Sequence, residues 1–410
     1  MSAIITCIFN ACYKPVDIAM NLSSHPLMLY AAIVAIVYGA VFSLPEPELR
    51  QLAPQELRSW ALDVGLRPVP RTFDALRAVV EKPDNPLTPE KIALGKRLFN
   101  DPILSREDSV SCASCHIIDD GGDDNFATAV GYHGLKNPKH LNSPTVLNAA
   151  LARSQFWDGR APDVEAQAAG PIQAPFEMNL TPEEVVAKLS RRPDYVAAFR
   201  RVFADDEPAL TFANVRKAIG AYERTLLTES AYDRFLRGDD RALSEQALRG
   251  LNLFMQKGCK GCHAGMSLGG LSIQRFPLHR PITEVLDNAP FPFPNEGGFL
   301  GRDERRYFRV PLLRNVSRTA PYFHNGAVNE LREAVRIMSK YQLGREFTPA
   351  QIDDVVAFLE SLEGEPIFDR PEEESGRHAK QRPEGRLPEH VQLDTPVSLP
   401  PLGGGVVGNG

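Results

Sequence analysis

The pentapeptides CASCH at residues 112–116 and CKGCH at residues 259–263 decide the architecture of this 410-residue chain. In a C-x-x-C-H sequence, two thiols can join the vinyl groups of a haem as thioethers, and the adjacent histidine can ligate the iron from the proximal side. A zinc site would also use C-x-x-C pairs, whereas a thioredoxin-like motif would need a βαβ context, which the sequence lacks. Two such motifs therefore predict two covalent c-type haems. The residues expected to hold them are Cys112, Cys115, His116, Cys259, Cys262 and His263.

The N-terminal segment indicates export. The two remaining cysteines, Cys7 and Cys12, precede an apolar run at residues 26–44, which the polar stretch PEPELRQ follows. A signal-peptide core has about 7–15 apolar residues and a membrane span about 20, so this run lies between the two. We expect residues 1–45 to be a signal peptide or a membrane anchor. Both alternatives place the remainder in the periplasm, outside the cytoplasm, where covalent haem attachment finds the oxidising conditions that it needs.

Composition separates a globular part from a polar tail. Hydrophobic residues make up 43% and charged residues 24% of the chain, as in ordinary soluble proteins, and the length suffices for two domains. The formal net charge of −6, without any basic block, argues against nucleic acid as a partner. Residues 366–410 are rich in proline, charge and glycine and cannot bury a core, so we predict a disordered C-terminal tail.

Helix signals dominate the part between leader and tail. Thr88, Thr181, Ser244 and Thr348 each precede an apolar pattern with spacings of three and four residues, as N-cap residues do. Proline follows each of the three threonines, at the first helical position. Strand signals are few. The sequence therefore predicts a mainly α-helical fold with long loops.

An internal repeat divides this helical part into two halves. The matching segments, in order, are Gly95–Phe99 with Gly250–Phe254, the two haem motifs, Pro144–Asn148 with Pro311–Asn315, and Phe156–Gly159 with Phe323–Gly326. Their order and rough spacing are the same in both halves. We predict two tandem cytochrome c-like helical haem domains at residues 81–228 and 229–365, after an N-terminal extension at residues 46–80.

These motifs make the chain similar to the bacterial di-haem cytochrome c peroxidase and MauG superfamily. The resemblance runs from about Leu94 to Gly364 and includes LGKRLFNDPILS, NSPTVLNA, FWDGRA, VPLLRNV, TAPYFHNGA and EAVRIM. It implies that the N-terminal haem, in the domain at residues 81–228, is the peroxidatic one. The C-terminal haem, in the domain at residues 229–365, would be the electron-transfer haem.

The resemblance also implies roles for four side chains near the haems. Met338, in EAVRIM, matches the distal ligand of the electron-transfer haem, where MauG-type proteins have a tyrosine. Histidine with methionine closes both axial positions and raises the potential, which suits electron entry. Trp157 matches the tryptophan between the haems. Gln167 and Glu177 match the polar pair on the distal side of the peroxidatic haem, where a carboxyl group can move a proton.

Two further expectations concern the loops. The resemblance implies a calcium ion between the domains, held by Asn142, Thr319 and Pro321, whereas the acidic run at residues 119–125 lacks EF-hand spacing and is interpreted as a solvated turn. Related peroxidases often cap the resting peroxidatic iron with a loop histidine. Here Tyr132 falls on that position and His133 one residue later, so the distal ligand could be His133, Tyr132 or neither.

Taken together, the motifs and the resemblance predict a di-haem c-type peroxidase. It would reduce hydrogen peroxide to water with electrons that enter at the C-terminal haem and pass to the N-terminal haem. The alternative is a MauG-like enzyme that oxidises a tryptophan or tyrosine of a partner protein through high-valent iron. Met338 favours the peroxidase, and Tyr132 keeps the alternative open. A third class is an electron shuttle with both haems closed. The expected partners are peroxide, a small c-type cytochrome or cupredoxin as donor, a protein substrate in the MauG-like case, and a second copy in a homodimer.

Overall fold

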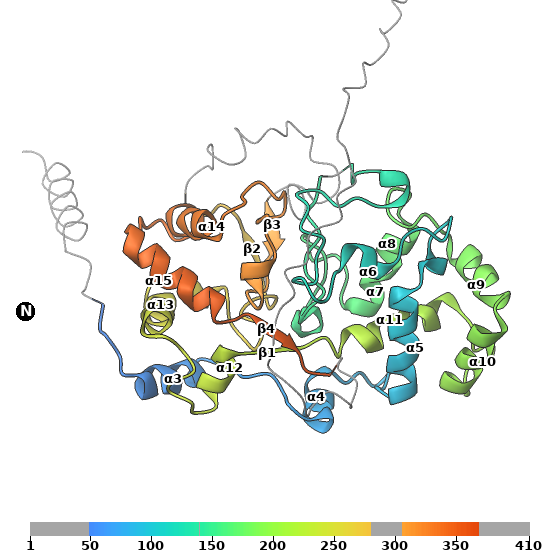
Figure 1. Ribbon diagram of the computed structural model, residues 1–410, viewed down its shortest axis with the longest axis horizontal. Coiled ribbons are helices and arrows are strands. Elements are labelled where there is room, and N and C mark those ends of the chain that lie inside the picture. Colours follow the sequence, from blue (N-terminus) through green and yellow to red (C-terminus); the bar gives the residue numbers. More distant parts are fainter. Residues whose placement is uncertain (1–48, 139, 280–305, 369–410) are drawn as a thin grey trace, which may run out of the picture. The chain divides into compact units, whose positions relative to one another are not determined.

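Helices supply most of the regular structure in the computed structural model, which describes residues 49–138, 140–279 and 306–368 (Figure 1). The predicted leader at residues 1–45 lies outside these ranges, as does the predicted tail beyond Phe368. The described residues belong to one compact unit. None of their helices has the length and apolar character to cross a membrane.

The longer helices are α3 (Pro54–Asp63), α4 (Phe73–Val80), α5 (Pro89–Asn100), α9 (Pro182–Ser190), α10 (Pro193–Val202), α11 (Phe212–Glu223), α13 (Glu245–Gln256) and α15 (Pro349–Glu360). The shorter ones are α6 (Cys112–Cys115), α7 (Val164–Gln167), α8 (Ala169–Gln173), α12 (Ala231–Leu236) and α14 (Leu331–Ile337). Single turns form η1 (Pro102–Leu104), η2 (Tyr132–Gly134), η3 (Ala149–Leu151), η4 (Cys259–Gly261) and η6 (Val316–Arg318), and η7 (Met338–Gln342) is a π-helix. The strands of the described ranges are β1 (Thr228–Ser230), β2 (Ile273–Arg275), β3 (Tyr307–Arg309) and β4 (Gly364–Pro366). The prediction of a mainly helical fold is thus confirmed.

The predicted helix starts are confirmed by their cap hydrogen bonds. The hydroxyl groups of Thr88, Thr181, Ser244 and Thr348 each accept a hydrogen bond from the backbone N–H three residues further on. These bonds satisfy N–H groups that have no partner inside a helix, which is why the four helices begin where the sequence places them.

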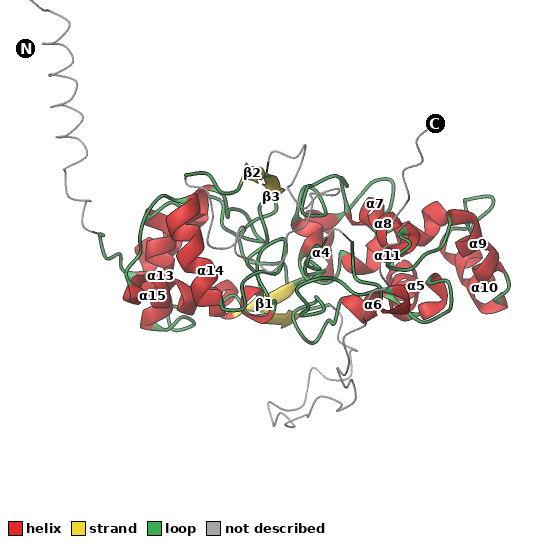
Figure 2. Cartoon of the chain, turned by 90° about the horizontal axis from the view of Figure 1, so that it is seen from above, coloured by secondary structure: helices red, strands yellow, loops and turns green. Residues whose placement is uncertain are grey.

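Two helix pairs, α5 with α11 and α13 with α15, form the centres of two hydrophobic clusters (Figures 1 and 2). Each pair crosses at a glycine of the internal repeat. A Cβ atom on Gly95 would lie 1.9 Å from the carbonyl oxygen of Ala218, and one on Gly250 would lie 1.8 Å from that of Asp354. Only glycine permits such close backbone approach, so the repeated glycine fixes the distance between the paired helices in each half.

The N-terminal extension at residues 46–80 contacts both clusters of helices. Leu57 and Ala61 of α3 are buried in the same cluster as Phe254 of α13. Leu76 of α4 packs instead with Ala221 of α11. The extension therefore forms part of the core, although the family resemblance begins only after it.

A short antiparallel ribbon joins the start of the second half to its end. Thr228 of β1 pairs with Pro366 of β4, and the backbone N–H of Ile367 donates to the oxygen of Leu227 over 2.9 Å. Phe368 packs against the hydrophobic cluster around Leu76. The predicted tail boundary at residue 366 is therefore too early, because backbone pairing and an aromatic contact continue through Phe368.

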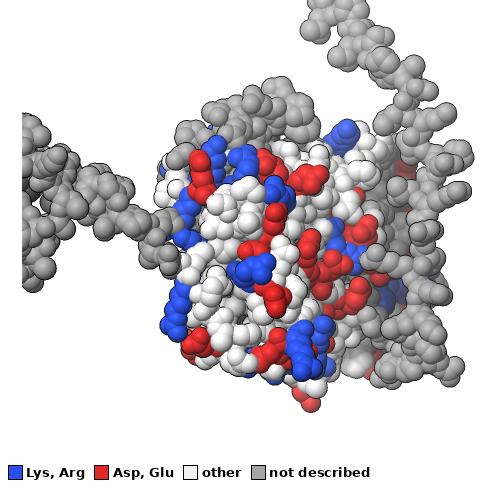
Figure 3. Space-filling model, turned by 60° about the vertical axis from the view of Figure 1, so that its left-hand side comes forward, with Lys and Arg blue, Asp and Glu red and all other residues white. Residues whose placement is uncertain are grey.

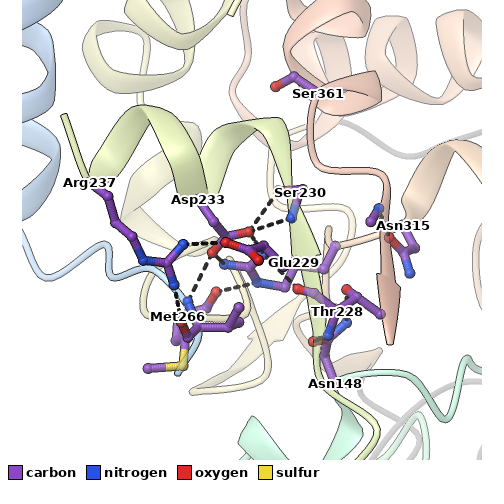
Figure 4. Close-up of polar contacts among 12 residues, drawn as sticks. Asn148, Thr228, Glu229, Ser230, Asp233, Arg237, Met266, Asn315 and Ser361 are labelled. Atoms are coloured by element: carbon purple, nitrogen blue, oxygen red, sulfur yellow. Dashed lines mark hydrogen bonds and ion pairs between the residues drawn. The ribbon is translucent and has the colours of Figure 1, made fainter. Parts of the chain in front are cut away.

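A buried ion pair between Arg314 and Asp233 links several segments near β1. Figure 4 shows the polar contacts around Asp233. Arg314 and Asp233 have no exposed side-chain surface, and two nitrogens of the guanidinium donate to the carboxylate over 2.7 and 2.8 Å. The same carboxylate accepts from the backbone of Val69 and Ser230, while Arg314 Nε donates to the oxygen of Met266 over 2.7 Å. Removing one partner of such a pair costs roughly 3–5 kcal/mol, because the other charge is left buried.

The glycine contact of the α13–α15 pair can be tested by adding a single methyl group. We expect Gly250→Ala to lower the free energy of unfolding by about 1–3 kcal/mol, because the helices must move apart. Chemical denaturation monitored by circular dichroism measures the change. Gly261→Ala is the matched control, since a Cβ there would have no neighbour within 4 Å. Equal stability of both variants would contradict the proposed role of Gly250.

Candidate haem sites

Nδ1 of each proximal histidine is hydrogen-bonded to a backbone carbonyl oxygen. Nδ1 of His116 donates to the oxygen of Gly122 over 3.0 Å, and Nδ1 of His263 donates to that of Leu268 over 3.1 Å. Because a carbonyl oxygen can only accept, the ring proton resides on Nδ1 and Nε2 keeps its lone pair. This is the tautomer that a metal-ligating histidine needs.

Burial keeps both rings neutral. It lowers the pKa of His116, and it lowers the pKa of His263 to about 4. The phenylalanine of the repeat accompanies each ring: the centroids of Phe99 and His116 are 6.4 Å apart, and those of Phe254 and His263 are 6.5 Å apart. The two sites are therefore built alike, and both histidines fit axial ligation of a haem iron.

The four motif cysteines form no disulfide. Burial, with smaller effects of nearby charges, raises the pKa of Cys115 to about 12, and burial raises that of Cys259 to about 12, so both groups are thiols at neutral pH. Within the described ranges, no cluster of three or more His, Cys, Asp or Glu side chains could hold a metal ion. Each thiol pair is therefore free of a disulfide and, within these ranges, belongs to no such cluster, which leaves it able to attach a haem.

A largely apolar cavity adjoins the second motif. Its wall includes Cys259, Cys262 and His263, and Met338 lines the same cavity. Met338 is the first residue of the π-helix η7, and π-helical turns are frequent at functional sites. Tyr341, the tyrosine that could compete with Met338, is instead buried in a cluster with Ile337 and Tyr322. The structure therefore brings the predicted methionine, rather than the nearby tyrosine, to the cavity of His263.

Trp157 connects the two halves at the wall of this cavity. Its Nε1 donates to the oxygen of Asn142 over 2.8 Å, and its own oxygen accepts from the backbone N–H of Arg309 over 2.8 Å. Its ring lies edge-on to His324, with 6.3 Å between centroids. The indole is thus held by the Asn142 carbonyl group of the first half and by the His324 ring of the second half.

Phe156 and Phe323 precede Trp157 and His324, and they have φ angles of 68° and 69°. A bulky residue in the left-handed region is uncommon, and such conformations concentrate at functional sites. The same strained backbone turn therefore positions a tryptophan in the first half and a histidine in the second. Burial lowers the pKa of His324 to about 3, with a smaller effect from Arg306, so this ring is neutral.

Glu177 lies near the first motif. Its charge helps to raise the pKa of Cys115, after the effects of burial and Asp124. A Cβ on Gly131 would lie 2.6 Å from the Cα of Glu177, and the N–H of Tyr132 donates to the oxygen of Glu177 over 2.8 Å. The loop after the first motif therefore packs directly on the Glu177 segment. Gln167, the other predicted polar residue, is half-buried at the end of α7.

Tyr132 and His133, the two predicted distal ligands, both turn to Glu107. The hydroxyl of Tyr132 donates to one carboxylate oxygen over 3.1 Å, and Nε2 of His133 lies 3.1 Å from the other. The His133 side chain is 55% exposed. Hydrogen bonds from His133 and then Tyr132 lower the pKa of Glu107. In this structure the loop thus presents both rings to a surface carboxylate.

The acidic run at residues 119–125 departs from its interpretation as a solvated turn. Asp123 has no exposed surface, and neither of its carboxylate oxygens has a hydrogen-bond partner in the structure. Burial, followed by the charge of Asp124, raises the pKa of Asp123 to about 7. The turn folds inwards because Gly121 packs against the oxygen of Arg318, where a Cβ would lie at 2.6 Å.

Asp123 lies next to the residues predicted to bind calcium. Its charge raises the pKa of Tyr322, after the effect of burial, which places the carboxylate beside the segment that contains Thr319 and Pro321. Nδ2 of Asn142 donates to the oxygen of Phe126 over 2.9 Å, just after the acidic run. The sequence did not single out Asp123, because a cluster of aspartates is usually solvated and nothing in the acidic run marks which of its residues is buried.

Comparisons with known proteins agree with this geometry. The family model described as di-haem cytochrome c peroxidase matches residues 89–241. The chain is 43% identical over 303 residues to a cytochrome c551 peroxidase of Pseudomonas aeruginosa, covering 73% of this chain and 84% of that protein. It is 38% identical over 314 residues to the methylamine utilization protein MauG of Methylorubrum extorquens, covering 71% and 85%.

A solved structure shows the same fold. The crystal structure of a MauG-like protein associated with microbial copper homeostasis superimposes with a TM-score of 0.61 at 27% identity, covering 71% of this chain and 94% of that one. The two C-x-x-C-H motifs, their Nδ1-anchored histidines and these relatives lead to one conclusion. The chain belongs to the di-haem cytochrome c peroxidase family, an oxidoreductase family whose members carry two haems.

Proposed function

We propose that this protein reduces hydrogen peroxide to water with electrons from a small redox protein. The observation that carries the proposal is the asymmetry of two otherwise similar sites. At the second site, Met338 shares a cavity with His263. At the first, a carboxylate, Glu177, lies near Cys115 of the motif. A histidine–methionine pair suits electron transfer, whereas a carboxyl group suits proton transfer to peroxide.

The two halves are proposed to act as tandem haem domains, at residues 81–228 and 229–365. The repeated glycine crossing and the Nδ1-anchored histidine support this division, because each half has both features. When bound, the two haems would supply the redox chemistry, with peroxide reduced at His116 and electrons received at His263. Cys112, Cys115, Cys259 and Cys262 would attach them.

Glu177 is proposed as the acid–base group. Peroxide reduction consumes two electrons and two protons, and one proton must move from one peroxide oxygen to the other before the bond breaks. The contact between Gly131 and Glu177 fixes the backbone of this residue, which limits where its carboxylate can reach. Gln167 is proposed to complete the polar pair by hydrogen bonding near the same position.

Trp157 is proposed as the electron relay between the two sites. Its indole lines the cavity of His263 and is bonded to Asn142 of the first half. The fixed N–H···O bond keeps the ring in one orientation, so the distance for electron transfer stays constant. His324, edge-on to this ring, adds a neutral aromatic neighbour without adding charge.

The alternative function is oxidation of a tryptophan or tyrosine on a partner protein. Its support is the similarity to the MauG protein of Methylorubrum extorquens. The resemblance assigns MauG-type proteins a tyrosine where this chain has Met338, and the structure places Tyr341 away from the cavity, in another cluster. The placement of Met338 therefore favours the peroxidase over the alternative.

The site of action and the donor are proposed from sequence. Residues 1–45 would export the chain to the periplasm, and N-terminal sequencing of protein recovered there would distinguish a cleaved signal from an anchor. A small c-type cytochrome or a cupredoxin would deliver electrons. On the face shown in Figure 3, Lys and Arg side chains are interspersed with Asp and Glu, so this face offers no surface of a single sign to a charged donor. Analytical ultracentrifugation would test the proposed homodimer.

A calcium ion is proposed near Asn142, Thr319 and Pro321. The support is Asp123, because a buried carboxylate without a hydrogen-bond partner is costly unless a cation accompanies it. Calcium prefers oxygen ligands, including backbone carbonyls and carboxylates. The pKa of about 7 applies without any cation, whose charge would lower it.

Met338→Ala is expected to lower the midpoint potential of the haem at His263. Axial ligands set haem potentials over roughly 0.8 V, so loss of the thioether should shift this value by tens of millivolts or more. Spectropotentiometry of the purified holoprotein measures both haems. Met255→Ala is the control, since Met255 is buried in the core of the same half. Unmoved potentials in Met338→Ala would reject the assignment of Met338 as a ligand.

Glu177→Gln is expected to reduce kcat/KM for peroxide by about 100-fold or more, which is the usual contribution of a general acid–base group. The optical spectra of both haems should stay unchanged, because no iron ligand is altered. Steady-state assays with a reduced cytochrome measure the effect, and Glu183→Gln, on the exposed first turn of α9, serves as control. Normal turnover of Glu177→Gln would exclude Glu177 as the proton carrier.

Asp123→Asn tests the cation site through pH and calcium. A raised pKa means that the folded state holds the proton more tightly, so without calcium the stability should fall as pH rises from about 4 through 7. Asp123→Asn should remove this fall. Saturating calcium should raise the Tm of the wild type at pH 8 more than that of the variant.

The control for this test is Asp119→Asn, because Asp119 is exposed in the same run. It should respond to calcium and to pH as the wild type does. Equal responses of wild type and Asp123→Asn to calcium in differential scanning calorimetry would refute a cation at Asp123.

A further inference from the structure

Arg309 is a buried cation in the wall of the cavity that contains His263 and Met338. The residue ends β3 and is 3% exposed. Its Nη1 has no hydrogen-bond partner in the structure, and it forms no ion pair with any described residue. Burial lowers the pKa of Arg309 to about 10, so the guanidinium remains charged at neutral pH.

A comparison with Arg314 shows what Arg309 lacks. Both arginines are buried, and they stand five positions apart in the same segment. Arg314 binds the carboxylate of Asp233 through two nitrogens. Buried arginines are normally paired in this way, because an isolated charge in an apolar interior is strongly unfavourable. The anion that compensates Arg309 must therefore come from outside the described chain, and the cavity is where it can arrive.

Two other donors of Arg309, Nε and the backbone N–H, are bonded to the segment that contains Phe156 and Trp157. Its Nε donates to the oxygen of Phe156 over 3.2 Å, and its backbone N–H donates to the oxygen of Trp157 over 2.8 Å. Two of its donors thus hold the tryptophan segment, whereas Nη1 has no partner and is covered by protein atoms. Arg309 as a residue lines the cavity, so a modest turn of its guanidinium would bring it to a ligand there. A planar guanidinium presents several donors in a fixed geometry that matches a carboxylate.

We infer that Arg309 binds a propionate carboxylate of the haem attached at Cys259 and Cys262, and that it couples this haem to the Trp157 segment. The inference rests on the proposed function, which places a haem in this cavity. A haem brings two carboxylates to an otherwise apolar pocket, and no described carboxylate serves Arg309. The guanidinium would stabilise the reduced haem relative to the oxidised one, because a nearby positive charge opposes a further positive charge on iron.

Through these contacts Arg309 can influence both the haem at His263, where electrons enter, and Trp157, which is proposed to relay them. Arg309 and Trp157 both line the cavity, and the backbone N–H of Arg309 donates to the oxygen of Trp157. Arg309 is a positioning residue in this scheme, since it acts through the haem carboxylate and through the backbone of Phe156 and Trp157.

The test is spectropotentiometry of the holoprotein carrying Arg309→Gln, Arg309→Lys or the control Arg332→Gln. Arg332 is an exposed arginine of the same half, paired with Asp353. Arg309→Gln should disfavour reduction of the haem at His263 by tenfold or more, which is a downward shift of about 59 mV for one electron. Arg309→Lys, which keeps the charge, should shift it less. The haem at His116 and the control should keep the wild-type potentials.

Mass spectrometry checks that Arg309→Gln carries both haems. If it does and both midpoint potentials are unchanged, the inference is overturned and the proposed function stays intact. A shift of the same size in Arg332→Gln would also overturn it. If Arg309→Gln fails to fold, the crystal structure of the wild-type holoprotein decides. A guanidinium nitrogen of Arg309 within about 3.2 Å of a propionate oxygen supports the inference, and a longer separation of all its nitrogens rejects it. Wild-type protein without haem at Cys259 and Cys262 would instead refute the proposed function itself.

Discussion

The hydrogen bond from Nδ1 of each proximal histidine to a backbone carbonyl is the constraint on which the sites depend. It joins His116 to Gly122 and His263 to Leu268, so each motif is bonded to the turn that follows it. The bond fixes the tautomer, the ring plane and the direction in which Nε2 points. The helices that carry the repeated glycine contact the haem motifs, α5 at α6 and α13 at η4, and the carbonyl oxygen orients the histidine of each motif.

The two halves share a backbone plan and differ in side chains. Asn148 and Asn315 both have left-handed φ angles, of 61° and 59°, and the phenylalanines before Trp157 and His324 do as well. On this common scaffold, a tryptophan in one half is replaced by a histidine in the other. The two halves therefore keep the same backbone turns and carry different side chains on them.

Much of the fold was predictable because its signals are local. Helix starts are marked by single N-cap residues such as Thr88 and Thr348. The helix crossings lie at the glycine of the repeat. The haem motifs were predictable for the same reason. Met338 depended on the family resemblance, since a methionine in an apolar helix usually packs in a core, and the structure places it at the cavity.

The parts that sequence did not predict depend on contacts between distant residues. Asp123 reads as a surface aspartate until the packing of Gly121 on Arg318 turns it inwards. Arg309 reads as one of many arginines, and only the absence of a described carboxylate beside it makes it unusual. Burial and charge compensation are properties of the assembled chain, so neither can be derived from a short stretch of letters.

The makeup of the second cavity has a consequence for how the protein is assembled. Cys259 and Cys262 stand well before Val355 and Leu359 in the sequence, yet all four line the same cavity. In a chain synthesised from its N-terminus, the thiols therefore exist before the α15 wall that encloses them. The wall of this cavity is therefore complete only when α15, with Val355 and Leu359, has folded against the motif.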